Sequence, residues 1–389
     1  MLEKLPYSKT DDYNEQQAQT RRDTVSKVTG QQFQHINKYS FDPQVTAGNI
    51  ENFSGVAQIP MGFAGPLLVN GEHAKGEFYI PMATSEGTLV ASYNRGMKIA
   101  RAAGGITSTV IDDKMNRAPV FIFNNAKLAR EFGFWIENNF SKIKEEAEQT
   151  TSVGKLLEID QYQIGKMRWL RFNYFTGDAA GQNMVTKATH RACNWILNQG
   201  WEGLENFSLA AGFDTDKKFS LINSLKTRGK RVVAEITLPK QLTEEVLNIS
   251  AEKMFKLRQL STTATVMNGS AGNGVHVANG LTAMFIATGQ DVANIAETCA
   301  AYYFGEFLPN GDYYYSITLP SLIVATFGGG TGLPTQRECL EMMDCFGKDK
   351  VNKLAEIMAA TALCGELSLG AAVAADEWVS SHEQYGRNR

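Results

Sequence analysis

The alternation of apolar and polar residues predicts a chain built from both helices and strands. Residues 14–27 are polar and contain little that breaks a helix, and Thr29-Gly30 ends this first predicted helix. Further on, short apolar runs at residues 67–69 and 78–81 flank a turn at Asn70-Gly71. Two such runs around a tight turn are typical of paired strands, so a sheet is expected to begin here. The first fifty residues are then a helical appendage.

The segment after this hairpin predicts a helix with an acidic residue at its start. Thr84 is the expected N-cap, Glu86 falls in the first turn, and Gly104-Gly105 ends the helix. The apolar face of this helix consists of Leu89, Val90, Tyr93 and Met97. Glu86 is therefore expected where a strand passes into a helix.

The middle of the chain alternates between strand-like and helix-like runs. In order, these runs are residues 121–123, 125–149, 168–176 and 183–199. Strand, helix, strand, helix in so short a stretch is typical of a compact α/β unit. Strand character returns at residues 231–238, and helices rich in small residues are expected at 276–288 and 366–381. The middle unit is thus predicted to be an insertion within a larger, helix-rich unit.

Composition and charge narrow the class of protein. The 389 residues are 43% hydrophobic and 20% charged, which is typical of a globular chain with two or three structural units. Lys and Arg total 38 against 41 Asp and Glu, without a long basic tract, so nucleic acid is not an expected partner. The polar N-terminus and the lack of about 20 uninterrupted apolar residues predict a cytoplasmic protein without a membrane partner.

The cysteines and histidines do not indicate a metal site. The five cysteines include no C-x-x-C pair, and their odd number favours reduced thiols over a disulfide framework. The five histidines are not spaced as metal ligands. No metal is therefore expected.

Two glycine-rich turns are candidates for binding an anion. The chain has neither the G-x-G-x-x-G fingerprint after a strand nor a G-x-x-x-x-G-K-[ST] loop, so a nucleotide must be bound in another way. Residues 177–184 and 328–332 each precede a predicted helix, where backbone N–H groups can face a phosphate. The alternative for each is a plain tight turn.

Four titratable residues have both a functional and a purely structural interpretation. Lys217 lies in an Asp-Thr-Asp-Lys-Lys loop, which is either a solvated surface turn or a fixed positive charge for a developing oxyanion. Asp291 follows an apolar helix and is either solvent-facing or paired, and His276 is either a core imidazole or a site residue. His382, near the C-terminus, is either exposed or a proton-transfer group with an ordinary pKa of about 6.5.

Several short segments, in a fixed order, join these features into one pattern. They are Glu51-Asn52-Phe53-Ser54-Gly55, Ile59-Pro60-Met61-Gly62, Pro81-Met82-Ala83-Thr84-Ser85-Glu86-Gly87, Ser92-Tyr93-Asn94-Arg95-Gly96, Met115-Asn116-Arg117-Ala118-Pro119, Thr215-Asp216-Lys217-Lys218, His276 to Asn279, Gly289-Gln290-Asp291, Gly328-Gly329-Gly330-Thr331 and Ser381-His382. In this order the chain resembles the soluble catalytic portion of the 3-hydroxy-3-methylglutaryl-coenzyme A (HMG-CoA) reductase family. Ile59-Pro60-Met61-Gly62 is closer to its biosynthetic branch.

The resemblance implies an α+β fold in which a small α/β, ferredoxin-like cofactor domain is inserted into a large helix-rich domain. The implied boundaries are 1–50 for the N-terminal helical segment, 51–117 with 208–389 for the large domain, and 118–207 for the inserted dinucleotide-binding domain. It also implies a homodimer, or a dimer-based homo-oligomer, with active sites at subunit contacts.

For the reaction, the resemblance implies an NADPH-dependent, two-step reduction of the HMG-CoA thioester to mevalonate and free coenzyme A. Lys217 corresponds to the lysine that stabilises the oxyanion, and Asp291 to the carboxylate that holds this lysine. Glu86 corresponds to the proton donor at the aldehyde oxygen, and His382 to the group that protonates the departing thiolate.

For the cofactor, the resemblance assigns a dinucleotide turn and a phosphate site. The implied cofactor residues are Asp178, Gly181, Asn183, Met184, Ser152, Lys155, Gly328 and Gly329. The turn departs from the family pattern at Ala180 and Gln182, where methionine is usual. Ser152 stands where some members have an arginine for the 2′-phosphate, and with Lys155 it favours NADPH over NADH, without excluding NADH.

For the acyl-CoA substrate, the resemblance also reveals a departure. The implied substrate residues are Arg117, Asp216, Lys218, His276, Asn279, Ser92, Asn94 and Arg95. Where the family binds the distal carboxylate with a serine and a lysine, this chain has Ala210 and Gln259, with Arg258 as a substitute cation. Two alternatives therefore stay open: a reductase of a different acyl thioester, and a non-catalytic relative of the family.

Overall fold

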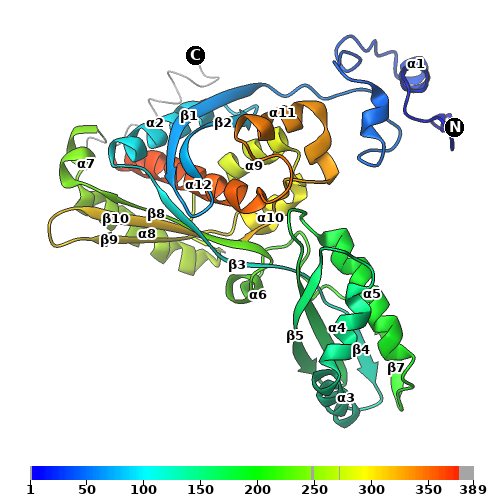
Figure 1. The fold of residues 1–389 in the computed structure, drawn as a ribbon. Helices are drawn as coiled ribbons and strands as arrows, with labels where there is room; N and C mark the ends of the chain where they lie inside the picture. The colour runs from blue at the N-terminus through cyan, green and yellow to red at the C-terminus, as the bar shows by residue number, and fades with distance from the viewer. Residues whose placement is uncertain (1, 247–248, 271, 376–389) are drawn as a thin grey trace.

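The computed structural model describes residues 2–246, 249–270 and 272–375, and Figure 1 shows a mixed helical and sheet architecture. The N-terminal segment contains helix α1 (Glu15–Thr29) and the short 3-10 helix η1 (Pro43–Thr46). Asn14 caps α1 by accepting from the Gln17 amide, and Gly30 ends it with φ +72°. The prediction for this helix is confirmed, and Figure 1 shows it at one side of the molecule.

The predicted hairpin is confirmed and is longer than expected. Strands β1 (Met61–Asn70) and β2 (Lys75–Ala83) pair antiparallel from Met61↔Ala83 to Asn70↔Lys75. Its turn is held by Glu356, whose carboxylate accepts from the His73 and Ala74 amides at 2.8 and 2.6 Å. Glu72, His73 and Glu356 place potential ligand atoms within 4.8 Å of one another, but these backbone bonds already occupy Glu356.

Helix α2 begins later than the sequence predicted. It spans Leu89–Ala102 with Thr88 as N-cap, so the predicted N-cap at Thr84 and the helical position of Glu86 are wrong. The Thr84 hydroxyl instead accepts from the Glu86 amide at 3.0 Å, and Thr88 has φ +69°. This local bond and the left-handed residue keep Glu86 in a loop ahead of the helix.

The apolar C-terminal helix α12 (Val351–Ala374) passes through the main core. It starts well before the predicted residue 366, and the predicted end at 381 lies outside the described residues. By length and composition α12 resembles a membrane span, but 83% of its most apolar window is buried inside the protein. The main core also packs against α7 (Lys240–Val246), α8 (Ala251–Asn268), α9 (Val277–Thr288), α10 (Ile295–Thr298) and α11 (Pro334–Met342). The 3-10 helix η2 (Val292–Asn294) directly precedes α10, and the 3-10 helix η3 (Gly329–Gly332) precedes α11.

One long strand, β3 (Thr107–Arg117), connects two parts of an eight-stranded sheet. Its first part pairs with β8 (Gly229–Leu238), which continues to β10 (Tyr313–Leu322) and β9 (Tyr302–Phe307). Its last residues, Met115 to Arg117, pair with β6 (Met167–Phe175). Figure 1 shows the second part projecting from the body below β3.

The projecting part has its own strand order and its own core. Its strands β4 (Val120–Phe123), β5 (Lys155–Ile164), β6 and β7 (Leu204–Ser208) are antiparallel neighbours in the order β7-β4-β6-β5. Helices α3 (Ala126–Asn138), α4 (Phe140–Glu148) and α5 (Gln182–Leu197) contribute to a core around Phe121, Phe132 and Phe172.

The single helix predicted at residues 125–149 is two helices, α3 and α4. They meet at Asn139, whose side-chain amide donates to the Trp135 carbonyl at 2.9 Å. A side chain that bonds the backbone in this way competes with the helical pattern, so the helix ends there. The predictions for β4, β6, α5, β8 and α9 are confirmed to within a few residues.

Candidate active site

The pair Lys217 and Asp291 forms one side of the candidate site. Lys217 lies in the loop between β7 and α6 (Leu221–Lys226), and Asp291 follows the end of α9. The Lys217 Nζ lies 2.9 Å from Asp291 Oδ2, and the two side chains are 44% and 40% exposed. The hydrogen bond that Lys217 donates to Asp291 raises the pKa of the Lys217 amine, against the effect of partial burial. Lys217 is therefore an ammonium that faces solvent beside a carboxylate.

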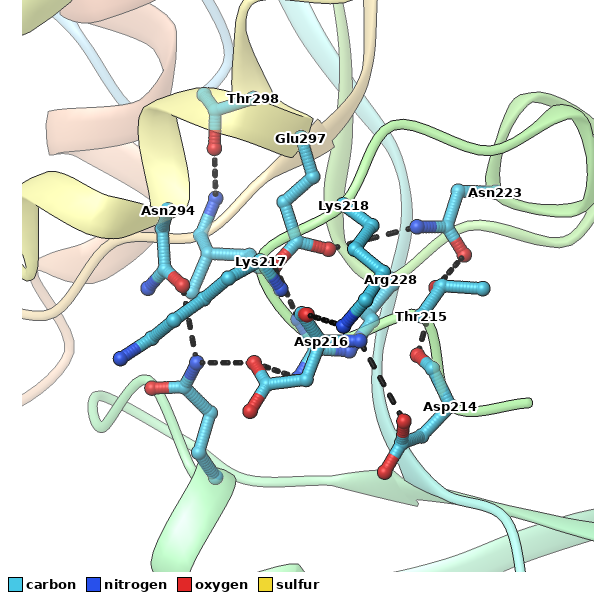
Figure 2. Close-up of polar contacts among 12 residues, drawn as sticks. Asp214, Thr215, Asp216, Lys217, Lys218, Asn223, Arg228, Asn294, Glu297 and Thr298 are labelled. Atoms are coloured by element: carbon cyan, nitrogen blue, oxygen red, sulfur yellow. Dashed lines mark hydrogen bonds and ion pairs between the residues drawn. The ribbon is translucent and has the colours of Figure 1, made fainter. Parts of the chain in front are cut away.

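The backbone of Lys217 is held in an unusual conformation. Its φ is +57°, and Thr215 two residues earlier has φ +60°. The Lys217 amide donates to Glu297 Oε1 at 2.9 Å, as Figure 2 shows. The side chain of Thr215 donates to Asn223 Oδ1 at 3.0 Å. Hydrogen bonds at Thr215 and at Lys217 therefore fix a backbone conformation that L-residues rarely adopt.

Beneath this loop lies a buried ion pair between Arg228 and Glu297, 0% and 1% exposed. The second nitrogen of the guanidinium donates to Asp216 Oδ1 at 2.9 Å (Figure 2). Burial raises the pKa of the Glu297 carboxyl, while the Arg228 charge and the Lys217 amide oppose that rise.

A second group of predicted site residues contains Glu86, Asn279 and His276, and no hydrogen bond or ion pair among the described residues joins it to Lys217 or Asp291. The Asn279 amide lies 3.4 Å from Glu86 Oε1 and 3.1 Å from His276 Nδ1. Burial lowers the pKa of His276 to about 4, so this imidazole is neutral near pH 7. Its ring packs on Tyr93 at a centroid distance of 4.9 Å. Glu86 is exposed on its loop, whereas His276 is buried.

A cavity of about 640 Å³ brings the two glycine-rich turns together beside Asp291. Its lining includes Gly181, Asn183, Met184, Gly328 and Gly329. Gly181 is the N-cap of α5, has φ +84°, and provides no side-chain cap for the first amides of the helix. A Cβ at this position would lie 2.4 Å from a Thr176 carbon, so glycine is required. The cavity thus combines a helix N-terminus with a second glycine-rich turn.

Among the residues that the structure describes, three other predicted cofactor residues lie outside the lining of this cavity: Asp178, Lys155 and Ser152. Asp178 caps the start of α12, accepting from the amides of Asp349, Lys350 and Val351 at 2.9, 3.1 and 3.2 Å. Lys155 is exposed and paired with Glu148 at 3.1 Å. Ser152 is exposed in the loop before β5.

The predicted substrate residues on α2 and β3 already have protein partners. Ser92 and Arg95 contact Ser368 of α12 at 3.1 and 3.0 Å. Asn94 accepts from the Gly65 amide at 2.7 Å. Arg117 is paired with Asp214 and donates to the Thr186 hydroxyl at 2.7 and 3.0 Å.

Lys218 is exposed and donates to the Asp216 carbonyl at 3.1 Å, and Ala210 and Gln259 are also exposed. Arg258 lies 3.6 Å from buried Glu366 and stacks on Tyr303 at 4.9 Å. Its charge is therefore already balanced by a protein carboxylate. His382 lies outside the described residues.

Sequence reasoning missed Glu297, Arg228 and the contacts of Gln182. The Gln182 side-chain amide donates to Asp216 Oδ1 at 3.1 Å and to Asn294 Oδ1 at 3.0 Å. These bonds connect α5 to the loop that contains Lys217. Glu297 and Arg228 are 69 positions apart, and no local pattern marks them as partners. A buried acid in an apolar stretch was the only available signal.

Comparison with known proteins identifies the family of this site. The family model described as hydroxymethylglutaryl-coenzyme A reductase matches residues 17–387. The 3-hydroxy-3-methylglutaryl-coenzyme A reductase of Pyrococcus horikoshii is 43% identical over 94% of this chain and 91% of that protein. The enzyme of Methanocaldococcus jannaschii is 44% identical over 94% and 92%.

A class II HMG-CoA reductase from Streptococcus pneumoniae, solved bound to NADPH, has the same fold. Its TM-score is 0.67 at 21% identity, with 90% of this chain and 82% of that chain covered. The chain belongs to the HMG-CoA reductase family.

Proposed function

We propose that the chain is an NADPH-dependent HMG-CoA reductase, which converts HMG-CoA to mevalonate and free coenzyme A in two hydride transfers. The observation that carries the proposal is the Lys217–Asp291 pair beside a cavity where two glycine-rich turns meet. Membership of the family and the names of the relatives support it. The non-catalytic alternative gives no reason for an exposed, raised-pKa lysine at such a cavity.

The cavity fits a dinucleotide. The uncapped first turn of α5 and the backbone at Gly328 and Gly329 offer N–H groups to a diphosphate. Asn183 and Met184 would hold the remainder of the cofactor, and Asp178 would fix the turn from behind through α12. Ser152 and Lys155 would bind the 2′-phosphate, which favours NADPH. When bound, NADPH supplies the hydride.

Lys217 would stabilise the negative oxygen that develops when the thioester carbonyl is reduced to a hemithioacetal. Asp291 holds the Lys217 ammonium in position. Both side chains remain partly exposed, so the ammonium can still contact a substrate oxygen. This division of roles needs no metal.

Glu86 would donate the proton to the aldehyde oxygen in the second reduction. The Asn279 amide orients the Glu86 carboxyl and contacts neutral His276 at the same time. His382 would protonate the leaving coenzyme A thiolate, which would otherwise add back to the aldehyde. The substrate itself would be contacted by the remaining residues implied by the family pattern: Ser92, Asn94, Arg95, Arg117, Asp216, Lys218, His276 and Asn279.

The residues around the distal carboxylate favour HMG-CoA only in part. Lys218 is an exposed cation, but Ala210 and Gln259 cannot supply a hydroxyl and an ammonium, and Arg258 is already paired with Glu366. A charged hydrogen bond contributes roughly 1.5–3 kcal/mol, so loss of two should raise the Michaelis constant by orders of magnitude. A thioester with another distal group is the alternative substrate.

The domain organisation and the assembly are parts of the same proposal. Residues 118–207 would be an inserted, ferredoxin-like domain, since the β-α-β-β-α-β order and the separate core support that description. Residues 51–117 and 208–389 would form the large domain, with 1–50 as an N-terminal segment. The enzyme would act in the cytoplasm as a homodimer or dimer-based oligomer.

A substrate panel tests the proposed function. NADPH oxidation is measured with HMG-CoA and with acyl-CoAs that lack the distal carboxylate. Turnover of HMG-CoA with an elevated Michaelis constant is expected. Micromolar saturation by HMG-CoA with no turnover of the others would show that positions 210 and 259 were misinterpreted, and no turnover of any thioester would refute the reductase.

A further inference from the structure

The short segment from Asp291 to Thr298 holds Lys217 at two points. At the tip of the side chain, Nζ is 2.9 Å from Asp291 Oδ2. At the backbone, the Lys217 amide donates to Glu297 Oε1 at 2.9 Å. Asp291 is the N-cap of η2 and Glu297 lies in α10. The two residues that contact Lys217 are therefore connected by one short helical segment.

We propose that the buried Glu297–Arg228 pair is a positioning unit, which fixes the Lys217 backbone so that its ammonium reaches the carbonyl oxygen of the substrate. This inference rests on the role of Lys217 in the proposed function. Both members are buried, so water does not compete for the Glu297 oxygen that receives the Lys217 amide.

Arg228 extends the unit to the other side of Lys217. One of its nitrogens pairs with Glu297, and another donates to Asp216 Oδ1 at 2.9 Å. Asn223 completes it by donating to Glu297 Oε2 at 3.4 Å and accepting from Thr215 at 3.0 Å. Figure 2 shows these residues around the loop. Asp216, the residue before Lys217, is therefore bonded to the buried pair directly, and Thr215 is connected to it through Asn223.

The positive φ of Lys217 makes this support necessary. An L-residue at φ +57° is in a sparsely populated region, and it persists only where surrounding contacts determine it. Without the acceptor at Glu297, the loop is free to relax toward ordinary backbone angles. A displacement of about 1 Å at a catalytic group can lower a rate by roughly 100-fold.

Two double variants isolate the hydrogen bond from the buried charge. Arg228→Leu with Glu297→Leu removes both charges and the acceptor, whereas Arg228→Leu with Glu297→Gln removes the charges and keeps an acceptor. Replacing a buried ion pair by apolar residues is often neutral for stability, so both are expected to fold. The control is Lys230→Leu with Asp113→Leu, a 2.7 Å pair on β8 and β3 without a contact to Lys217.

The expected result is a split between turnover and binding. The Leu/Leu variant should lose about 10- to 100-fold in kcat with HMG-CoA, while its Kd for NADPH changes by less than about 2-fold. The Leu/Gln variant should recover most of this loss, and the control should keep normal kcat. In a Lys217→Ala background, the Leu/Leu change should add less than about 2-fold.

Several outcomes overturn the inference. These are a normal kcat for the Leu/Leu variant, an equal loss in the Leu/Gln variant, an undiminished further loss in the Lys217→Ala background, or a pair whose variants fail to fold while the control folds. Normal turnover of Lys217→Ala alone would instead refute the catalytic role of the lysine. The two failures are therefore distinguishable.

Discussion

The two sides of the candidate site differ in how firmly they are held. Lys217 is bonded at its backbone to buried Glu297 and at its tip to Asp291. Glu86 is exposed on a loop ahead of α2, and its contact with Asn279 is long, at 3.4 Å. The group proposed to stabilise negative charge is thus held in place, and fixed geometry at such a group contributes most to a rate.

The largest effect is expected on the rigid side. Lys217→Ala removes the ammonium that we propose stabilises the oxyanion, and loss of one such donor should lower kcat by about 10²–10³. NADPH oxidation with HMG-CoA measures the change, and the unfolding transition confirms that the variant is folded. Near-normal turnover of the folded Lys217→Ala variant would contradict the proposed role of Lys217.

Asp291→Asn should have a smaller effect and a pH signature. Without the carboxylate the pKa of Lys217 falls toward its ordinary value, because the hydrogen bond and the charge of Asp291 are lost and only the charge of Asp216 still favours the ammonium. The active form is protonated, so the alkaline limb of the kcat profile should move to lower pH. Loss of a charged hydrogen bond predicts a fall in kcat of about one to two orders of magnitude. An unmoved alkaline limb would contradict the pairing.

The side of the site that contains Glu86 should tolerate a substitution better than the side that contains Lys217. Asn279→Ala removes one long hydrogen bond to Glu86, so kcat should fall only about 2- to 10-fold. Steady-state kinetics compared with Lys217→Ala decide the ranking. A loss as large as that of Lys217→Ala would mean that Glu86 is as rigidly positioned as the lysine.

The smallest effect is expected far from both sides, at the proposed 2′-phosphate site. Lys155→Ala should raise the Michaelis constant for NADPH by less than about 5-fold and leave that for NADH unchanged, because an exposed ion pair contributes little. Lys127→Ala, at another exposed pair on α3, is the control. Equal changes for both cofactors would argue against contact with the phosphate.

The sequence predicted those elements whose signals are local. Asn14 and Gly30 bound α1 as expected, because caps act within one turn. Thr84 was wrong as a cap, since the left-handed Thr88 ends the loop instead and the sequence does not encode that angle visibly. Asn139 likewise divided one predicted helix into two.

Long-range contacts limited the prediction of the site. The family pattern pointed to Lys217 and Asp291, and the structure brings them to 2.9 Å. The buried partners Arg228 and Glu297 had no such signal, because Arg228 directly precedes β8 and Glu297 lies in α10, 69 positions further along the chain. Asp178 shows the same limit, since its carboxylate caps α12, more than 170 positions further on.

The stoichiometry of the reaction tests the central claim most directly. With HMG-CoA limiting, NADPH oxidation and release of the coenzyme A thiol are followed together in the same sample. The account predicts about two NADPH oxidised for each thiol released, with mevalonate as the product, because reduction of a thioester to a primary alcohol takes two hydrides and releases one thiol. A ratio near one with an aldehyde accumulating, or thiol release without NADPH oxidation, would contradict it.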